Sequence, residues 1–288
     1  MKTGITGKII ALIDGSIYSE SVCHHAAWIS QRTGAPVELI HVLGRAEGKG
    51  NTDLSGSIRL GARTKLLEEL AELDAQRAKL VSHRGRAILE DARAIIDKDG
   101  VTEITTRLRH GDVVEAIAEI EADARVILIG KRGEDADFAK GHLGSNLERI
   151  VRAAHRPVFV ASRAFKPIET VLVAYDGGRS AMKAVDHIAR SPLFVGLSVT
   201  VVTVGSDTAE TRKGLEDARA LLKAAGIEAD TRILNGQPET ELGKLVEEEG
   251  FGMLVMGAYG HSRIRSLVIG STTTAMVRSC KVPVVLMR

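Results

Sequence analysis

The stretch MLVMGAYGHSRIRSLVIGSTTT, from Met253 to Thr274, decides how the whole chain is interpreted. It opens with a short apolar run that ends at Gly257, a pattern typical of a strand buried on both faces. Gly260 allows positive φ and lets the backbone approach a ligand closely. Gly270 precedes four hydroxyl residues, which are favoured at the start of a helix. Such a helix directs its free N–H groups and positive dipole end at the glycines, so the stretch predicts a phosphate-binding loop.

The spacing of this loop is Gly-x2-Gly-x9-Gly-Ser. It lacks the Gly-Lys-Ser/Thr of the P-loop and the Gly-x-Gly-x-x-Gly of dinucleotide folds. An ordinary strand–loop–helix connection, whose glycines serve only turn geometry, is the simpler alternative. The buried strand before the loop, the hydroxyls after it and a second copy earlier in the chain favour the phosphate-binding interpretation.

Composition indicates a protein with substantial cores and a charged surface. The 288 residues are 44% apolar and 26% charged, and this length suggests about two domains. Lys and Arg total 39 against 37 Asp and Glu, and aromatic residues are only 3%. This balance argues against a partner that is nucleic acid or a membrane surface. The sequence shows no secretory signal and no apolar run of ~18 residues that could span a membrane. Its two cysteines, Cys23 and Cys280, lie far apart, which is typical of a reducing compartment. These features predict a cytoplasmic protein.

The chain contains an internal repeat. Two apolar runs, IIALIDG and VLVAYDG, each end in Asp-Gly. Their aspartates, Asp14 and Asp176, align at an offset of 176 − 14 = 162 residues. The same offset aligns Val204 with Val42 at the ends of two Val-rich runs. The two halves are therefore tandem copies of one unit.

Further along the chain the offset falls. Gly236 aligns with Gly111 at 236 − 111 = 125, and Gly257 aligns with Gly130 at 257 − 130 = 127. The first copy of the glycine loop is completed by Gly133, Gly144 and Ser145. The first half therefore carries 162 − 125 = 37 extra residues between its second and third strands.

These extra residues fall within 44–100. The part at 44–61 is rich in Gly and Ser and predicts a loop. From Ala62 onward leucine and isoleucine recur near helical spacing, which predicts a long helix that Gly85 is expected to break or kink. Such a helix either packs on its own sheet, the commoner arrangement, or offers a surface to a partner.

The sequence predicts an α/β fold of two tandem doubly wound domains, each with a five-stranded parallel sheet. Strands rich in Val and Ile alternate with helical segments, as in sheets buried on both faces. We expect the domains at 1–163 and 168–288, separated by a linker with Lys166-Pro167. Strands are expected at 8–14, 36–43, 102–108, 125–130 and 157–161, and at 169–175, 197–205, 228–234, 252–257 and 283–287.

In sheets of this kind, ligands bind beyond the carboxyl ends of the strands, where the strand order reverses. We therefore expect a crevice in each half, formed at Asp14, Val42, Gly111 and Gly130 in the first and at Asp176, Val204, Gly236 and Gly257 in the second. Asp176 is suited to accept from a ribose hydroxyl or to hold Mg²⁺ among phosphates. The backbone at Val204 is suited to pair with an adenine edge. Each aspartate is equally well explained as a turn residue before glycine.

With these motifs assembled, the chain resembles the universal stress protein family in its tandem two-domain form. The resemblance covers essentially the whole sequence. It implies a Rossmann-like fold of the adenine-nucleotide alpha-hydrolase type, a regulatory role in stress responses and ATP, with Mg²⁺, as the ligand. The family's nucleotide-binding pattern falls on Gly257, Gly260, Gly270 and Ser271, followed by Thr272, with the early aspartate at Asp176 and the adenine contact at Val204.

The first half departs from that pattern. Ten residues separate Gly133 from Gly144, one more than the family spacing. Between its second and third glycines, the first loop has three acids, Glu134, Asp135 and Asp137, and one base, Lys140. Lys131 and Arg132, just before it, offset part of this negative charge. The corresponding part of the second loop has two bases, Arg263 and Arg265, and no acid. A carboxylate beside a phosphate repels it by about 1 kcal/mol at ~4 Å in water. We expect ATP mainly in domain 2, with the domain 1 site weaker or empty.

Family members also pair through their last strands, which correspond here to 156–161 and 282–287. An exposed apolar edge strand is a liability unless it is covered. Pairing these two strands within one chain makes it a pseudo-dimer, and association through residues 44–100 leaves a homodimer open.

No arrangement of nucleophile, base and orienting group is recognisable. Cys23, His24 and His25 point in different directions on a helix and do not face one metal ion together. His25 and His187 occupy matching positions, which favours a packing role. We expect a nucleotide-dependent regulatory binder with at most slow hydrolysis or self-phosphorylation. A true ATPase or phosphotransferase, and a nucleotide-free module for another small ligand or a protein, are the alternatives; the protein partner is unknown.

Overall fold

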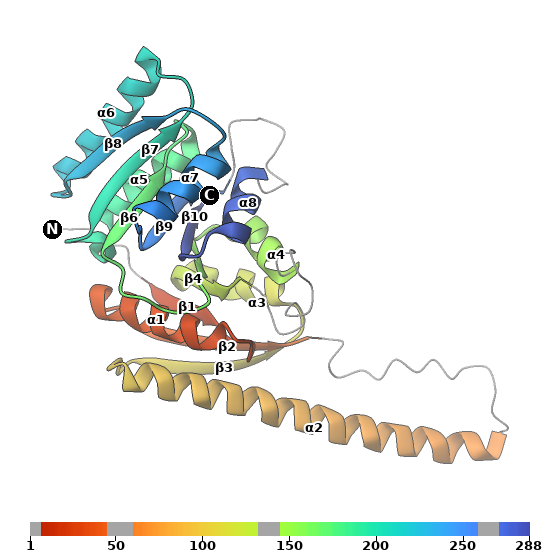
Figure 1. Cartoon of the computed structure of the whole chain (residues 1–288). Coiled ribbons are helices and arrows are strands. Elements are labelled where there is room, and N and C mark those ends of the chain that lie inside the picture. The colour runs from red at the N-terminus through yellow and green to blue at the C-terminus, as the bar shows by residue number, and fades with distance from the viewer. Residues whose placement is uncertain (1–6, 45–59, 132–144, 259–270) are drawn as a thin grey trace.

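The computed structural model describes residues 7–44, 60–131, 145–258 and 271–288 (Figure 1). Strands in these residues begin and end within two residues of the predicted ranges. They are β1 (Lys8–Leu12), β2 (Val37–Leu43), β3 (Ile104–His110), β4 (Ala124–Gly130), β5 (Val158–Ala161), β6 (Thr170–Ala174), β7 (Ser198–Val204), β8 (Ala229–Leu234), β9 (Met253–Gly257) and β10 (Val284–Met287).

Helices connect the strands in both halves, as the alternating pattern predicts. The first half contains α1 (Ser19–Thr33), α2 (Leu60–Lys98), α3 (Val113–Ile120), the short 3₁₀ helix η1 (Glu121–Asp123) and α4 (Ser145–Ala153). The second contains α5 (Arg179–Arg190), the 3₁₀ helix η3 (Pro192–Phe194), α6 (Ala209–Ala224), α7 (Pro238–Glu248) and α8 (Ser271–Ser279).

All these strands form one continuous sheet in the order β3-β2-β1-β4-β5-β10-β9-β6-β7-β8. Within each half the strands are parallel, and the halves meet where β5 and β10 pair antiparallel. At this seam Val160 lies opposite Val284 and Phe159 opposite Val285. The internal pairing of the two last strands is therefore confirmed. It joins the two predicted sheets into one and removes two edges that would otherwise be exposed.

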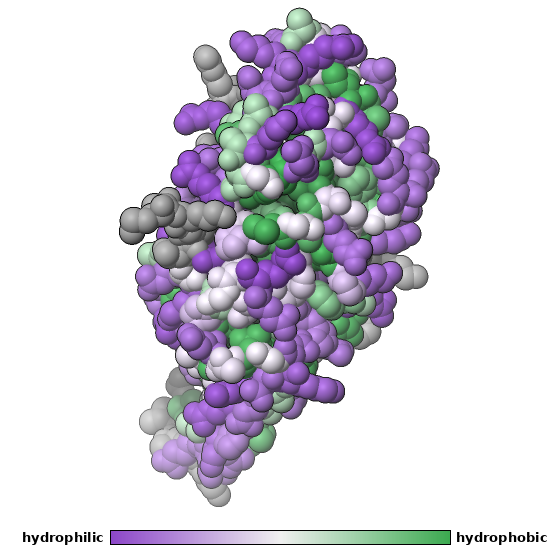
Figure 2. Space-filling model, turned by 90° about the vertical axis from the view of Figure 1, so that its left-hand side faces the viewer, coloured by the Kyte–Doolittle hydropathy of each residue, from purple (hydrophilic) through white to green (hydrophobic). Residues whose placement is uncertain are grey.

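The two faces of the sheet are covered by different sets of helices. One hydrophobic cluster joins the strands to α1, α2, α5 and α6, and it runs from Ile9 in the first half to Val285 in the second. The other joins them to α3, α4, α7 and α8. Each cluster crosses the seam, so the two halves share both cores. Figure 2 shows hydrophilic side chains over much of one side of the molecule, with hydrophobic residues in patches between them.

The extra residues of the first half form α2, and its two ends differ. Its carboxyl-terminal part packs on α1, β2 and β3 through residues such as Leu89 and Ile96, whereas its amino-terminal part extends away from the body (Figure 1). The prediction that Gly85 breaks the helix is wrong, because α2 continues through it. A Cβ at Gly85 would lie 2.8 Å from Leu108 Cδ1 and 2.9 Å from His41 Cδ2, so the glycine allows close packing on the sheet.

None of the helices in the described ranges combines the length and apolar character needed to cross a bilayer.

Candidate functional site

The second glycine loop connects the end of β9 to the start of α8. β9 ends at Gly257 and α8 begins at Ser271, followed by Thr272, whereas Gly260 and Gly270 lie outside the described residues. The Thr273 hydroxyl, whose residue is 4% exposed, lies 3.3 Å from the Gly257 carbonyl oxygen and 3.4 Å from that of Ala258. This contact holds the first turn of α8 against the end of β9. The amino terminus of α8 therefore lies at the carboxyl edge of the sheet, where its dipole favours an anion.

Gly257 is fixed by its neighbour on α5. A Cβ at this position would lie 2.4 Å from Ser180 Oγ and 3.0 Å from Ser180 Cβ. Ser180 is itself buried and belongs to the first turn of α5. The glycine therefore allows the end of β9 and the start of α5 to lie against each other.

Asp176 lies in the turn between β6 and α5, immediately after Tyr175. It is exposed, and its Oδ1 accepts a hydrogen bond of 2.8 Å from the backbone N–H of Gly178. Gly177 between them has φ +76°, a conformation that favours glycine. The turn function weighed from the sequence is thus present, and the second carboxylate oxygen lies at the edge where β6 and β9 end.

Val204 is the last residue of β7 and extends past the end of β6. The ladder between the two strands ends with Ala174 opposite Val202, whose carbonyl accepts from the Tyr175 N–H at 2.8 Å. Alternate residues of a strand direct their backbone groups to the same side. The N–H and C=O of Val204 therefore point beyond the end of β6, into the same region as Asp176.

The two halves repeat the site down to single hydrogen bonds. In the second half, Thr203 Oγ1 donates to the Tyr175 carbonyl at 2.8 Å. In the first half, where both residues lie 162 positions earlier, His41 Nδ1 contacts the Ile13 carbonyl at 2.6 Å. The glycines after β3 and β8 are also alike, because Gly111 has φ +120° and Gly236 has φ +134°. The sequence repeat therefore corresponds to a structural repeat in the segments that border both crevices.

The first crevice differs in how its aspartate is held. Asp14 Oδ1 accepts from the Ser16 N–H at 3.0 Å and from the Ser19 hydroxyl at 3.1 Å, and the residue is half-buried. A Cβ at Gly15 would lie 2.9 Å from Ile88 Cδ1, so α2 packs directly against this turn. The aspartate of the first half is therefore more enclosed than its counterpart in the second.

An ion pair also borders the first crevice. Asp112 follows Gly111 and caps α3 by accepting from two backbone N–H groups, while Arg149 on α4 donates to its other carboxylate oxygen at 2.6 Å. This hydrogen bond from Arg149 holds the pKa of the Asp112 carboxyl below its ordinary value. By the repeat, the corresponding residues of the second half are Gln237 and Ala275, so the pair is confined to domain 1.

Lys131, at the start of the first glycine loop, makes a contact across the seam. Gly130 ends β4, and Lys131 is buried with its ammonium donating to the backbone carbonyl of Cys280, across the seam. There it lies just past the carboxyl-terminal end of α8, where a cation is favoured by the helix dipole. Gly133 and Gly144 lie outside the described residues, and α4 begins at Ser145.

Cys23, Cys280 and His25 are buried in the core. His25 is fully buried, its Nδ1 donates to the Ser21 carbonyl at 2.7 Å, and burial lowers its pKa to about 4. Its neighbour His24 contacts Asp99 instead, at 2.6 Å. Burial raises the pKa of the Cys23 thiol to about 12. In the described part of the chain, no group of three or more His, Cys, Asp or Glu side chains could hold a metal ion.

The geometry so far defines a class of protein: two fused, doubly wound α/β domains that share one sheet and have matching strand ends and turns at its carboxyl edges. The family model of the universal stress protein family matches residues 6–162 and again 167–288. The chain is 34% identical to the universal stress protein Slr1230 of Synechocystis over 98% of its own length and 99% of that protein. This chain belongs to the universal stress protein family.

More distant relatives agree with this assignment. The universal stress protein Rv1996 of Mycobacterium tuberculosis is 24% identical, over 75% of this chain and 78% of that protein. A crystal structure of a universal stress protein from Archaeoglobus fulgidus superposes with a TM-score of 0.72 at 22% identity, covering 97% of this chain and 98% of that chain. The latter shows that the ten-stranded architecture has a solved counterpart.

Proposed function

We propose that this universal stress protein binds ATP in the crevice of its second domain and acts as a nucleotide-dependent regulator of stress responses. We also propose residues 1–163 and 168–288 as its two domains. The observation that carries the proposal is the start of α8 at Ser271, held by Thr273 against the end of β9. The first N–H groups of a helix have no partner within it, and at the carboxyl edge of the sheet they would stabilise a phosphate chain.

The other members of the predicted site support the same ligand. Asp176 would accept from a ribose hydroxyl or bind Mg²⁺ held by the phosphates, Val204 would pair with the adenine edge, and Gly236 and Gly257 would border the sugar and phosphates. Gly260, Gly270, Ser271 and Thr272 would complete the phosphate loop. Asp176, Val204, Gly236 and Gly257 each lie at or just past the end of a strand in one half of the sheet, and Ser271 and Thr272 begin α8.

We propose that the first crevice is the weaker site or is empty. Its counterparts are Asp14, Val42, Gly111, Gly130, Gly133, Gly144 and Ser145. Asp14 is held by Ser16 and Ser19, and the Asp112–Arg149 pair occupies the border of the crevice. A nucleotide would have to compete with these contacts, and the acids of the first loop would repel its phosphates.

Mass spectrometry of the purified protein gives the first test. We expect AMP, ADP or ATP to be released on denaturation of the wild-type protein and to be much reduced from an Asp176→Asn variant. Release of a different small molecule, or of none after purification at low salt, would favour the nucleotide-free alternative. Sustained turnover of Mg-ATP that disappears in Asp176→Asn would favour an ATPase over a regulatory binder.

We further propose that a second copy of this chain docks on the exposed part of α2, residues 66–84. Leu67, Leu73 and Leu80 are 56%, 60% and 70% exposed there, an unusual number of bare leucines on one helix. The charges are segregated along the segment. The acids Glu68, Glu69, Glu72 and Asp74 come first, and the bases Arg77, Lys79 and Arg84 follow. Two such helices packed antiparallel would place the acidic part of each beside the basic part of the other.

This arrangement predicts a dimer that depends on the exposed leucines. Sedimentation velocity at tens of micromolar should give a dimer for the wild type and a monomer for the double variant Leu73→Lys, Leu80→Lys. Because both side chains are exposed, the variant should keep its circular dichroism spectrum. The matched control is Val195→Lys, which changes another exposed apolar residue, 59% exposed, and should leave the dimer intact. A monomeric wild type, or a dimer that survives the double substitution, would refute the docking mode.

A further inference from the structure

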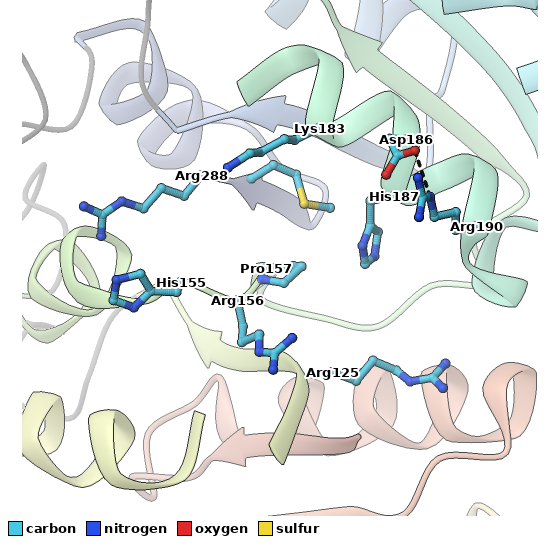
Figure 3. Close-up of a pocket in the computed structure, with 10 residues that line it drawn as sticks. Arg125, His155, Arg156, Pro157, Lys183, Asp186, His187, Arg190 and Arg288 are labelled. Atoms are coloured by element: carbon cyan, nitrogen blue, oxygen red, sulfur yellow. Dashed lines mark hydrogen bonds and ion pairs between the residues drawn. The ribbon is translucent and has the colours of Figure 1, made fainter. Parts of the chain in front are cut away.

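A basic pocket lies where the two halves of the sheet meet (Figure 3), and none of the described residues of the predicted nucleotide sites lines it. We call it the seam pocket; its volume is about 280 Å³. α5 contributes side chains from one side, and the turn before β5, the start of β4 and the end of β10 contribute from the other. The residues that line it are Arg125, His155, Arg156, Pro157, Lys183, Asp186, His187, Arg190, Met287 and Arg288.

The lining carries a marked excess of positive charge. It contains four arginines and a lysine but a single carboxylate, Asp186, which is already paired with Arg190 at 2.8 Å. Glu121, just outside the pocket, is paired with His155 at 2.7 Å. Lys183 has no ion-pair partner among the described residues. The basic side chains of the lining therefore outnumber its acidic side chains.

Arg125 is the residue that points most directly to a ligand. Its Nε and Nη1 atoms are buried, yet neither has a hydrogen-bond partner in the described structure. A buried donor without an acceptor costs about 1–3 kcal/mol, and more when the group is charged. The burial of this guanidinium also lowers its pKa, and its charge contributes, after burial itself, to lowering the pKa of His187 to about 4. The structure thus keeps an unsatisfied cation beside a cavity that could hold its counterion.

Comparison with the other half shows that the basic lining is not inherited from the repeat. The 162-residue offset places Ser21 and Trp28 at the positions of Lys183 and Arg190, and the 127-residue offset places Gly252 at that of Arg125. The space beside His25 is filled instead. Phe159 and Phe165 contact its ring at centroid distances of 5.1 and 5.0 Å. The position beside His25 is therefore apolar and closed, whereas the equivalent position beside His187 is open and lined by cations.

We propose that the seam pocket binds a small anion that carries one or two phosphate groups, with Arg125 as its principal contact and the other cations of the lining around it. Guanidinium groups bind phosphate oxygens through paired, charge-assisted hydrogen bonds, and a lysine adds a point charge. A doubly charged phosphate matches the excess of cations better than a single carboxylate does. The volume, near the lower end of small-molecule sites, suits pyrophosphate or a small phosphate ester.

Because the pocket is lined from β4 and the turn before β5 in the first half and from α5 and β10 in the second, its occupation would couple the two halves. The proposal is independent of ATP binding, since none of the described crevice residues lines this pocket.

The direct test is isothermal titration of nucleotide-free, full-length protein with inorganic pyrophosphate and, separately, with glycerol 3-phosphate. We expect binding of at least one of them, weakened about tenfold or more by Arg125→Leu and to a smaller extent by Lys183→Ala. Preference for pyrophosphate identifies an inorganic ligand, and preference for the ester an organic one. Lys223→Ala, which removes an exposed lysine on α6, is the matched control and should bind like the wild type.

The same titration separates the pocket from the nucleotide crevice. Asp176→Asn should keep its affinity for pyrophosphate. Absence of binding at millimolar concentrations, unchanged affinity in both pocket variants, or loss of affinity in Asp176→Asn would each overturn the proposal.

Thermal unfolding gives a second readout that a purely structural arginine would not produce. Without ligand, Arg125→Leu should raise the melting temperature, because it replaces a half-buried arginine that has two unpartnered buried nitrogens with an apolar side chain. Pyrophosphate should raise the melting temperature of the wild type but not of the variant. A lower melting temperature for Arg125→Leu, with no response of the wild type to pyrophosphate, would show that the residue is structural.

Discussion

Replacing Gly257 with alanine is expected to weaken ATP binding by about 10- to 100-fold. The added Cβ would lie 2.4 Å from Ser180 Oγ and 3.0 Å from Ser180 Cβ, so the end of β9 and the start of α5 must move apart. Overpacking of this kind costs about 1–3 kcal/mol, and each 1.4 kcal/mol lost from binding is about tenfold in affinity. Both displaced segments border the crevice, because Asp176 lies in the turn that leads into α5. Isothermal titration with Mg-ATP measures the effect.

Two further variants show whether the steric contact is the cause. Adding Ser180→Gly to Gly257→Ala removes both close atoms and should restore most of the affinity, so the two effects should be strongly non-additive. Gly243→Ala on α7 is the matched control. A Cβ there meets nothing within 4 Å, so this variant should bind ATP normally and gain up to about 1 kcal/mol of stability. Normal binding by Gly257→Ala would show that the end of β9 does not shape the site.

Truncation of Phe159 to alanine should lower the free energy of unfolding by about 3–5 kcal/mol, the usual cost for a buried phenylalanine. Phe159 is 1% exposed, lies opposite Val285 in the antiparallel seam and contacts the His25 ring. Because both halves share the sheet and its two cores, the loss should be felt by the whole molecule. Chemical denaturation should therefore show a single transition, shifted to lower denaturant.

The matched control for this variant is Val195→Ala, at an exposed apolar residue, which should change the free energy of unfolding by less than about 0.5 kcal/mol. Two separated transitions, of which Phe159→Ala shifts only the first, would mean that the halves unfold independently and that the seam contributes little to stability.

Much of the architecture follows from short-range patterns in the chain. Buried strands read as Val- and Ile-rich runs, and Asp14 and Asp176 mark the repeat because each ends such a run. The start of α8 is predictable because hydroxyl residues follow Gly270. These features depend on neighbours in sequence, where periodicity and turn chemistry act. They place the strand ends and most of the candidate crevice without reference to tertiary contacts.

Contacts between distant segments could not be predicted in the same way. Nothing near Lys131 indicates that its ammonium reaches the Cys280 carbonyl, 280 − 131 = 149 residues away. Gly85 looked like a helix breaker because only its low helix propensity is visible in the sequence. Its packing partners Leu108 and His41 lie on other elements, and their approach decides its role.

The role of single residues in the candidate site also depended on the fold. Ser180 and Thr273 carry no motif that distinguishes them from other hydroxyl residues, yet they hold the ends of α5 and α8 against β9. Arg125 is similar, since only the junction of the two halves surrounds its side chain with other cations. The repeat does indicate that Arg125 has a role specific to the first half, because the corresponding residue of the second half is a glycine, Gly252.

The central claim is that the second crevice is the principal ATP site, and one measurement tests it most directly. Full-length wild type, Asp14→Asn and Asp176→Asn are titrated with Mg-ATP after removal of bound nucleotide. Asparagine keeps the turn hydrogen bonds of both aspartates, so each change removes little except the charge. We expect Asp14→Asn to bind ATP like the wild type and Asp176→Asn to lose about tenfold or more in affinity for ATP. Loss of binding in Asp14→Asn, with Asp176→Asn unaffected, would contradict it.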